Sequence, residues 1–156
     1  MKKSIIAVMT VVLLSILPAG AAELKTTVWE SYGVSFSAPA DIIVEDDSEE
    51  GYSVSNSDIF ITIQILTGDG MSKESISEDL RNIASEDQLT DTTSISKLDL
   101  QHFEVAYLRG KCETDKCLYS YLLAKDGSCG FYLSIIYGNE KEETVEEILK
   151  SFKLSE

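Results

Sequence analysis

The chain has 156 residues, the size of one ordinary domain, and 44% of them are hydrophobic, which is enough for a packed core. Its 13 Lys and Arg residues are outnumbered by 27 Asp and Glu residues, so the formal net charge is −14 at pH 7. This balance argues against nucleic acid or an anionic lipid surface as the main partner, because both require a basic face. The single His excludes every multi-His metal site.

The first 22 residues have the pattern of a cleavable signal peptide. Two Lys residues at positions 2–3 precede an apolar stretch at 5–17, and small residues follow at 19–22. The apolar stretch is shorter than the roughly 20 residues of a membrane-spanning helix, and no Cys follows it for lipid attachment. We expect cleavage before Ala22 or Glu23 and a soluble periplasmic or secreted protein with no transmembrane anchor. Loss of the Lys pair leaves 11 basic against 27 acidic residues, a net charge of −16.

The segment after the leader is predicted to form strands. Apolar residues alternate with Ser over residues 34–38, and a short apolar run follows at 42–44. Residues 51–55 and 59–66 read as a hairpin across Asn56-Ser57-Asp58. The second arm of this hairpin is apolar on both sides, which is typical of a strand covered on both faces of a sheet.

A helix, four strands and a second helix are expected next. Ser72 is a candidate cap for a helix that runs to about Gln88, with a stripe of apolar residues at helical spacing. The four strands are expected at residues 95–98, 103–109, 118–125 and 131–137. Asn139 is a candidate cap for the final helix, which repeats the apolar stripe from Val145 to Phe152.

This order predicts an α+β fold with one domain at residues 23–156. Consecutive strands joined by tight turns form a mostly antiparallel sheet, here of about 6–8 strands, and the two amphipathic helices have to cover it. The expected architecture is therefore a sandwich.

Four features of the sequence resemble the PsbP-like fold group. They are Tyr32–Pro39 (YGVSFSAP), the Ile-rich strand that leads into the Ser72 helix, the run of four strands after that helix, and the closing ILKSFK at 148–153. The group includes the photosystem II PsbP subunit, DcrB-type bacterial envelope proteins and a eukaryotic nuclear-import factor that binds the Ran GTPase. The resemblance implies an α/β/α sandwich and a role as a non-catalytic partner or assembly factor, and it transfers no site residue.

Cys112 and Cys117 lie between two predicted neighbouring strands, and in an exported protein this spacing predicts a disulfide across a hairpin. Redox catalysis would instead need Cys-x-x-Cys at a helix start. Cys129 is left over, and a free buried thiol is its ordinary interpretation. The alternatives are a nucleophile paired with His102, or a zinc site of the three Cys with His102, which lacks the usual short ligand spacings.

The acidic turn at residues 45–50 is a weak candidate for a divalent-cation site. Asp46, Asp47, Glu49 and Glu50 resemble the first half of a calcium loop, but the twelfth position is Ser57 instead of the required Glu. A solvated turn is the simpler expectation, so no metal and no cofactor are predicted.

Tyr residues are concentrated in the last three expected strands. Tyr119, Tyr121 and Tyr132 suit a sheet face half covered by a helix, and they also suit a surface that binds a partner, which Trp29 would extend. We take these four residues as the candidate partner surface.

The predicted function is binding of an envelope or secreted protein, without catalysis. A divalent-cation or small-ligand module that uses the turn at 45–50 is the alternative. A hydrolase or thiol enzyme ranks below both, because no Gly-x-Ser-x-Gly elbow or phosphate loop is present.

Overall fold

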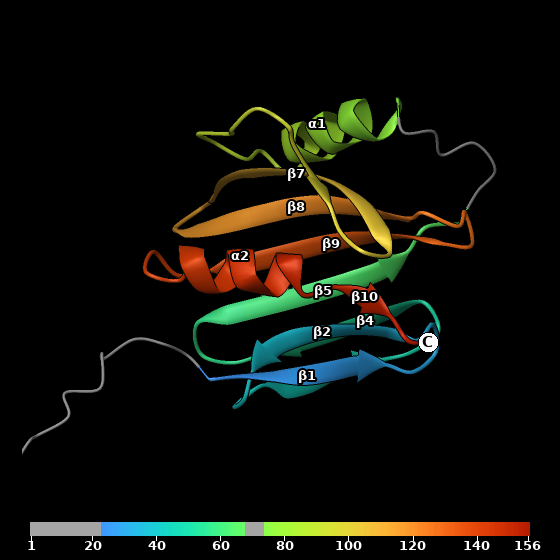
Figure 1. The fold of residues 1–156 in the computed structure, drawn as a ribbon. Helices are drawn as coiled ribbons and strands as arrows, with labels where there is room; N and C mark the ends of the chain where they lie inside the picture. Colours follow the sequence, from blue (N-terminus) through green and yellow to red (C-terminus); the bar gives the residue numbers. More distant parts are fainter. Residues whose placement is uncertain (1–22, 68–73) are drawn as a thin grey trace, which may run out of the picture.

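A computed structural model describes residues 23–67 and 74–156 of the chain. The predicted signal peptide and the predicted cap Ser72 therefore lie outside the described residues. Within these ranges the chain forms two antiparallel sheets and two helices (Figure 1). No helix among them is long and apolar enough to cross a membrane.

The larger sheet has seven strands, in the spatial order β3, β4, β5, β9, β8, β7 and β6. Their bounds are β3 Ile43–Asp47, β4 Gly51–Ser55, β5 Ile59–Ile65, β6 Ser96–Asp99, β7 Phe103–Cys112, β8 Asp115–Ala124 and β9 Gly130–Tyr137. The smaller sheet is formed by β1 Leu24–Trp29, β2 Val34–Pro39 and β10 Lys153–Leu154, in the order β1-β2-β10. The helices are α1 Ile76–Glu86 and α2 Glu142–Lys150. The predicted α+β sandwich is confirmed.

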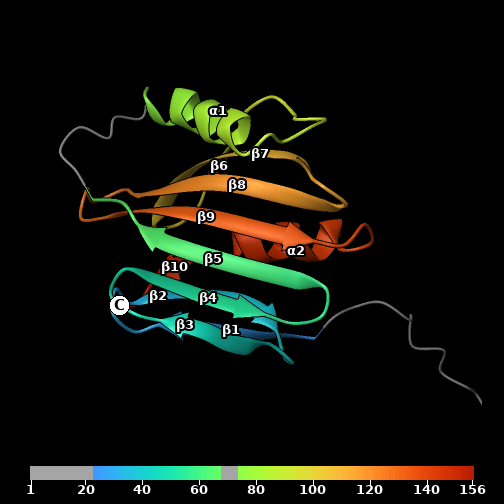
Figure 2. The ribbon, with the colours of Figure 1, turned by 180° about the vertical axis from the view of Figure 1, so that it is seen from behind.

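The larger sheet is covered differently on its two faces. Helix α2 and the smaller sheet pack on one face, whereas α1 packs on the other, over β7 and β8 (Figures 1 and 2). Two apolar cores result. The first, below α2 and the smaller sheet, includes Trp29, Phe36, Leu118 and Leu149. The second, below α1, includes Leu80, Leu108 and Tyr119.

The segment after α2 holds the smaller sheet against the rest of the fold. The ring of Phe36 stacks on that of Phe152 with 4.7 Å between centroids. The Ser37 N–H donates to Ser151 Oγ at 2.8 Å, and the Leu154 N–H donates to His102 Nδ1 at 3.2 Å. These contacts position β2 between β1 and β10.

One expectation about coverage is wrong. Strand β5 does lie inside the sheet, between β4 and β9, but only its Ile59, Ile61 and Ile63 side is buried. Phe60 and Gln64, on the other side, are exposed. The reason is the position of α1, which covers the β7–β8 half of that face and leaves the half that contains β5 uncovered (Figure 2).

The helix bounds also differ from the predicted ones. Helix α1 is preceded by Ser75, and no side chain hydrogen bond caps it. Helix α2 follows Lys141 instead of Asn139, again without a side-chain cap. Strands β1 and β10 were not predicted, because β1 contains polar residues and β10 has only two residues.

Candidate functional site

Within residues 23–67 and 74–156, four strands have part of one sheet face without a covering helix, and we call this surface the open face. It lies on the α1 side of β3, β4, β5 and β9 (Figure 2). The pairing places its side chains in rows across the strands: Ile43, Ser55, Phe60 and Ile136 in the first, Asp46, Ser53, Thr62 and Ser134 in the second, and Gly51, Gln64 and Tyr132 in the third. The open face is therefore apolar at one end and mostly hydroxyl-lined in the middle.

The first row carries large apolar side chains that reach solvent. Ile43 is 62% exposed and Phe60 is 39% exposed, and they lie on either side of the small residue Ser55. Val44 is also exposed, but it points to the opposite face of β3, because its partner across the strands is the buried Val54. An exposed aromatic and an exposed Ile in one row are typical of an interaction site.

Acidic side chains border these apolar residues. A bulge between Val44 and Asp46 shifts the pairing of β3, and the Ser55 hydroxyl donates to Glu45 Oε1 at 2.6 Å. A Cβ at Gly51 would lie 3.6 Å from Asp46 Oδ2, so this carboxylate also lies over the open face. None of the positions in the three rows is Lys or Arg. The open face is therefore negative.

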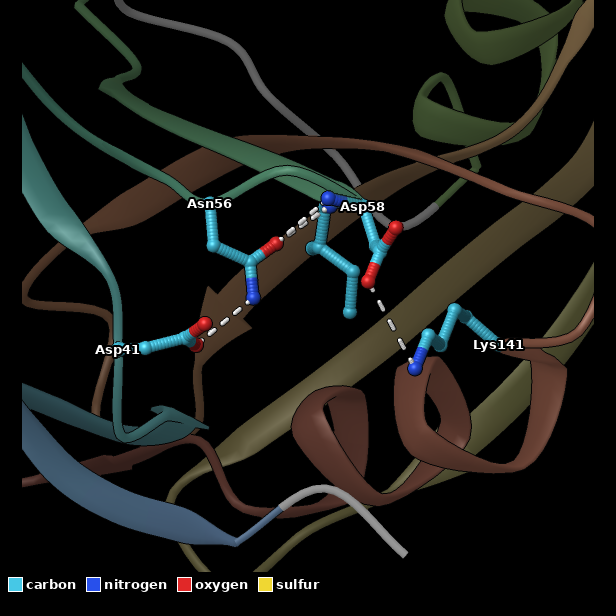
Figure 3. Close-up of polar contacts among 5 residues, drawn as sticks. Asp41, Asn56, Asp58 and Lys141 are labelled. Atoms are coloured by element: carbon cyan, nitrogen blue, oxygen red, sulfur yellow. Dashed lines mark hydrogen bonds and ion pairs between the residues drawn. The ribbon is translucent and has the colours of Figure 1, made fainter. Parts of the chain in front are cut away.

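At the end of the open face, the β4–β5 hairpin separates two hollows. The Asn56 side chain shapes this hairpin, because its Oδ1 accepts hydrogen bonds from the N–H groups of Asp58 and Ile59, both at 2.8 Å (Figure 3). Its Nδ2 donates to Asp41 Oδ1 at 2.9 Å, and Lys141 Nζ lies 3.8 Å from Asp58 Oδ2. The hairpin is thus held to the β2–β3 turn and to the start of α2.

The two hollows differ in position and lining. The first, of about 300 Å³, opens beside Phe60 and Ile136 and includes Asp115. The second, of about 290 Å³, lies on the other side of the hairpin and includes Glu23 and Asp41. Both are lined in part by Asn56 and Asp58. Only the first is continuous with the open face.

The four aromatic residues of the candidate partner surface do not form one exposed surface. Trp29 is fully buried in the first core, where its Nε1–H donates to the Ser48 carbonyl at 2.9 Å. Tyr119 and Tyr121 are buried in the second core, and Tyr132 is half-buried against them. The physical reason is that Trp29 lies on the inner face of β1, whereas the tyrosines lie below α1, on the other side of the larger sheet. Only Tyr132 borders the open face.

Burial keeps the tyrosines of the second core in the neutral form. It raises the pKa of Tyr119, and a hydrogen bond from the Tyr119 hydroxyl to Asp87 Oδ2, at 2.6 Å, raises the pKa further. Burial also raises the pKa of Tyr121 and of Tyr132. The Tyr119 phenol therefore acts as a hydrogen-bond donor inside a packed layer.

The acidic turn does not converge on a single point. Asp46 pairs with Ser53 and Asp47 with the buried Tyr52, so these two neighbours point to opposite faces of β3. Ser48 Oγ donates to Asp46 Oδ2 at 3.3 Å. The remaining two candidates, Glu49 and Glu50, are exposed. Across residues 23–67 and 74–156, no group of three or more His, Cys, Asp or Glu residues is arranged to hold a metal ion.

Cys112 and Cys117 form the predicted disulfide, across the β7–β8 hairpin, with their Cα atoms 6.1 Å apart. Cys129 is a free, half-buried thiol. The Ala124 N–H donates to the Cys129 carbonyl at 2.9 Å, so Ala124 lies opposite Cys129 in the β8–β9 hairpin. His102 accepts the hydrogen bond from Leu154 described above. Among the described contacts, none joins His102 to Cys129.

The arrangement of sheet, smaller sheet and two helices is that of a known class, the Mog1 fold. The structure is similar to that of the Ran-binding protein Mog1p of Saccharomyces cerevisiae, with a TM-score of 0.60, 9% identity, and 86% of this chain and 96% of that chain covered. A point mutant of protein Mog1 gives a TM-score of 0.57 at 9% identity, with 85% and 96% covered. This likeness concerns the fold, and the predicted PsbP-like resemblance agrees with it at that coarse level.

By sequence, the chain belongs to the dihydro-orotase-like family, whose model matches residues 13–141. No curated protein matches the sequence.

Proposed function

We propose that this protein is a non-catalytic module whose open face binds a protein partner. The contact surface of that partner is basic. The observation that carries the proposal is the exposure of Phe60 and Ile43 on a sheet face that α1 leaves uncovered. The acidic Glu45 and Asp46 beside them favour a basic partner over an acidic one.

The fold neighbours support a protein as the partner. Mog1p is described as a Ran-binding protein, and it shares this arrangement of sheets and helices. A flat sheet face with exposed apolar residues and small hydroxyl residues also suits a protein surface better than a small molecule, which requires a concave site.

The name of the family refers to an enzyme, and the contacts of the best catalytic candidates favour binding instead. His102 accepts a hydrogen bond from the backbone of β10, and none of the described contacts joins it to Cys129. The imidazole therefore serves to hold segments of the fold together. We expect no hydrolysis of dihydro-orotate by the purified protein, measured as the loss of substrate absorbance over time; turnover that disappears in His102→Gln would contradict the proposal.

The proposed place of action rests on the sequence alone. We propose that the leader is removed on export by cleavage before Ala22 or Glu23, and that binding occurs in the periplasm or outside the cell, with an envelope or secreted protein. The intact mass of the protein recovered from the producing cells tests this step. A mass that still includes residues 1–22 would contradict it.

Site-specific photo-crosslinking in the producing cells tests the docking surface. A benzophenone side chain replaces Thr62, in the middle of the open face, or Lys25, which is exposed on β1 on the far side of the molecule. We expect a covalent adduct of higher mass from position 62 and none from position 25.

Two matched substitutions complete the test. Phe60→Ser removes an exposed apolar side chain from the open face, whereas Val44→Ser removes one from the opposite face of β3. The adduct should weaken at least fivefold in Phe60→Ser and persist in Val44→Ser. Equal adducts from positions 62 and 25, or equal losses in the two Ser variants, would contradict docking on the open face.

A further inference from the structure

The hollow beside Phe60 adjoins the open face, and its lining indicates which kind of side chain it can bind. It has a volume of about 300 Å³ and lies where the β4–β5 hairpin, the start of β8 and the end of β9 meet. This volume is at the lower limit of sites for small-molecule ligands, so it suits one long side chain better than a whole ligand. We propose that it receives an arginine side chain of the protein partner.

The apolar part of the hollow comes from two residues in contact across strands. Phe60 of β5 pairs directly with Ile136 of β9, and both border the hollow. Phe60 is 39% exposed, so part of its ring is available to a partner. A guanidinium group stacks on an aromatic ring more favourably than an ammonium group does, because it is planar and more weakly hydrated.

The charged part of the hollow comes from two exposed carboxylates. Asp115 lies two residues before Cys117 on β8, hence on the α1 side of the sheet, and its carboxylate makes no ion pair or hydrogen bond within the described chain. Asp58 lies in the hairpin, and its charged neighbour Lys141 is 3.8 Å away, beyond a hydrogen bond. The Asp115 carboxylate is therefore free to accept hydrogen bonds from a guanidinium, and Asp58, although paired with Lys141, makes no hydrogen bond to it and can accept one as well.

The size, the aromatic lining and the charge of the hollow all favour an arginine side chain as its occupant. An acidic side chain would be repelled by Asp58 and Asp115, and an apolar one would leave the Asp115 carboxylate facing an interface without a partner. Arginine satisfies the aromatic and the acidic part together. This inference rests on the proposed function, because the arginine belongs to the protein that docks on the open face.

Nuclear magnetic resonance of the ¹⁵N-labelled protein tests the hollow without knowledge of the partner. The probe is N-acetyl-arginine methylamide, and the control is the citrulline analogue, which has the same shape without the charge. We expect the arginine probe to shift the backbone amides of Asp58, Phe60 and Asp115 at millimolar concentration. The citrulline probe should bind at least fivefold more weakly.

A charge-matched pair of variants makes the result specific. The double variant Asp58→Asn/Asp115→Asn should weaken binding of the arginine probe at least fivefold. Glu30→Gln/Glu78→Gln removes the same charge from exposed positions elsewhere and should leave the binding unchanged. Because all four residues are exposed, the ¹⁵N spectra of both variants are expected to keep the native pattern.

The outcomes separate the two proposals. Equal binding of the two probes, equal effects of the two double variants, or no shift at Asp58, Phe60 and Asp115 would overturn the arginine hollow. If the crosslink from position 62 persists under those results, the proposal of docking on the open face stands without the arginine hollow. If the crosslink is absent while the arginine probe binds as expected, the hollow stands and the docking proposal fails.

Discussion

At the scale of single residues, hydrogen bonds of aromatic side chains hold separate segments together. The Tyr119 hydroxyl joins β8 to Asp87, the residue that ends α1, and the Trp29 indole joins β1 to the turn after β3. Each donor is buried or nearly so, and its loss leaves a polar group without a partner.

We predict that Tyr119→Phe lowers the free energy of unfolding by about 1–2 kcal/mol at pH 7, since it removes the hydrogen bond to Asp87. The pKa of Tyr119 is raised in the folded state above its usual value of 10.0. The folded state therefore holds the phenol proton more tightly, so stability is intact below pH 10 and falls as the pH rises above it.

The tyrosine prediction is measured by urea unfolding between pH 7 and pH 11. In the Phe variant the decline above pH 10 should be shallower than in the unchanged protein. The remaining decline is caused by the other tyrosines with raised pKa values, which are Tyr52, Tyr121, Tyr132 and Tyr137. An identical decline in both proteins would contradict the role of Tyr119.

Residue spacing predicted only part of the candidate site. It assigned Tyr119, Tyr121 and Tyr132 to a sheet face, which is confirmed, because side chains alternate along a strand. It did not show that α1 lies over β7 and β8, which buries Tyr119 and exposes Phe60. That choice depends on how helix and sheet fit together, and an alternation pattern contains no such information.

At the scale of elements, the β7–β8 hairpin is the longest in the larger sheet, and its turn is strained. Glu113 has a φ of 53°, in the left-handed region that disfavours residues with a Cβ. The Cys112–Cys117 disulfide closes this turn, and the isolated bridge between Thr90 and Lys111 ties the segment after α1 to it. The disulfide therefore stabilises both the hairpin and the attachment of α1.

We predict that Cys112→Ser/Cys117→Ala lowers the free energy of unfolding by about 2 kcal/mol, the chain-entropy value for a short disulfide loop. Cys129→Ser, which removes a free thiol, should change it by less than about 1 kcal/mol. Urea unfolding measures both effects. Alkylation of the denatured, unreduced protein should modify one thiol, at Cys129; modification of Cys112 or Cys117 would contradict the pairing.

The elements themselves were largely predictable. The hairpin across Asn56-Ser57-Asp58 and the four strands before α2 appear where alternation and turn residues indicated them. Strand β1 was missed because Lys25, Thr26 and Thr27 interrupt its apolar pattern, and it is held by pairing with β2 across all six of its residues. Such long-range pairing is not encoded in the segment itself.

At the scale of the whole molecule, charge opposes folding. The formal net charge is −14, and folding brings the excess acidic groups close to one another. The ion pairs that offset their repulsion join exposed side chains, such as Lys150 with Glu146. Surface pairs of this kind contribute little. Repulsion among the excess carboxylates therefore lowers the stability of the whole domain.

We predict that raising KCl from 20 to 300 mM at pH 7 increases the free energy of unfolding by about 1 kcal/mol, or roughly 3 °C in melting temperature, because salt screens this repulsion. Differential scanning calorimetry measures the change, and glucose at equal osmolarity serves as the uncharged control. A melting temperature that falls with KCl would contradict a dominant repulsion.

The place of β10 beside β2 has a consequence for the order in which the molecule folds. The Ser37 N–H and Ser151 Oγ are separated by 114 residues, and β2 is bonded to β1 on one edge and to β10 on the other. During synthesis from the N-terminus, the β1–β2 hairpin can form early. The second edge of β2 has no partner strand until α2 and β10 have been synthesised. The smaller sheet can therefore close only as the last step, which makes folding slow and leaves an unpaired strand edge exposed to other chains throughout synthesis.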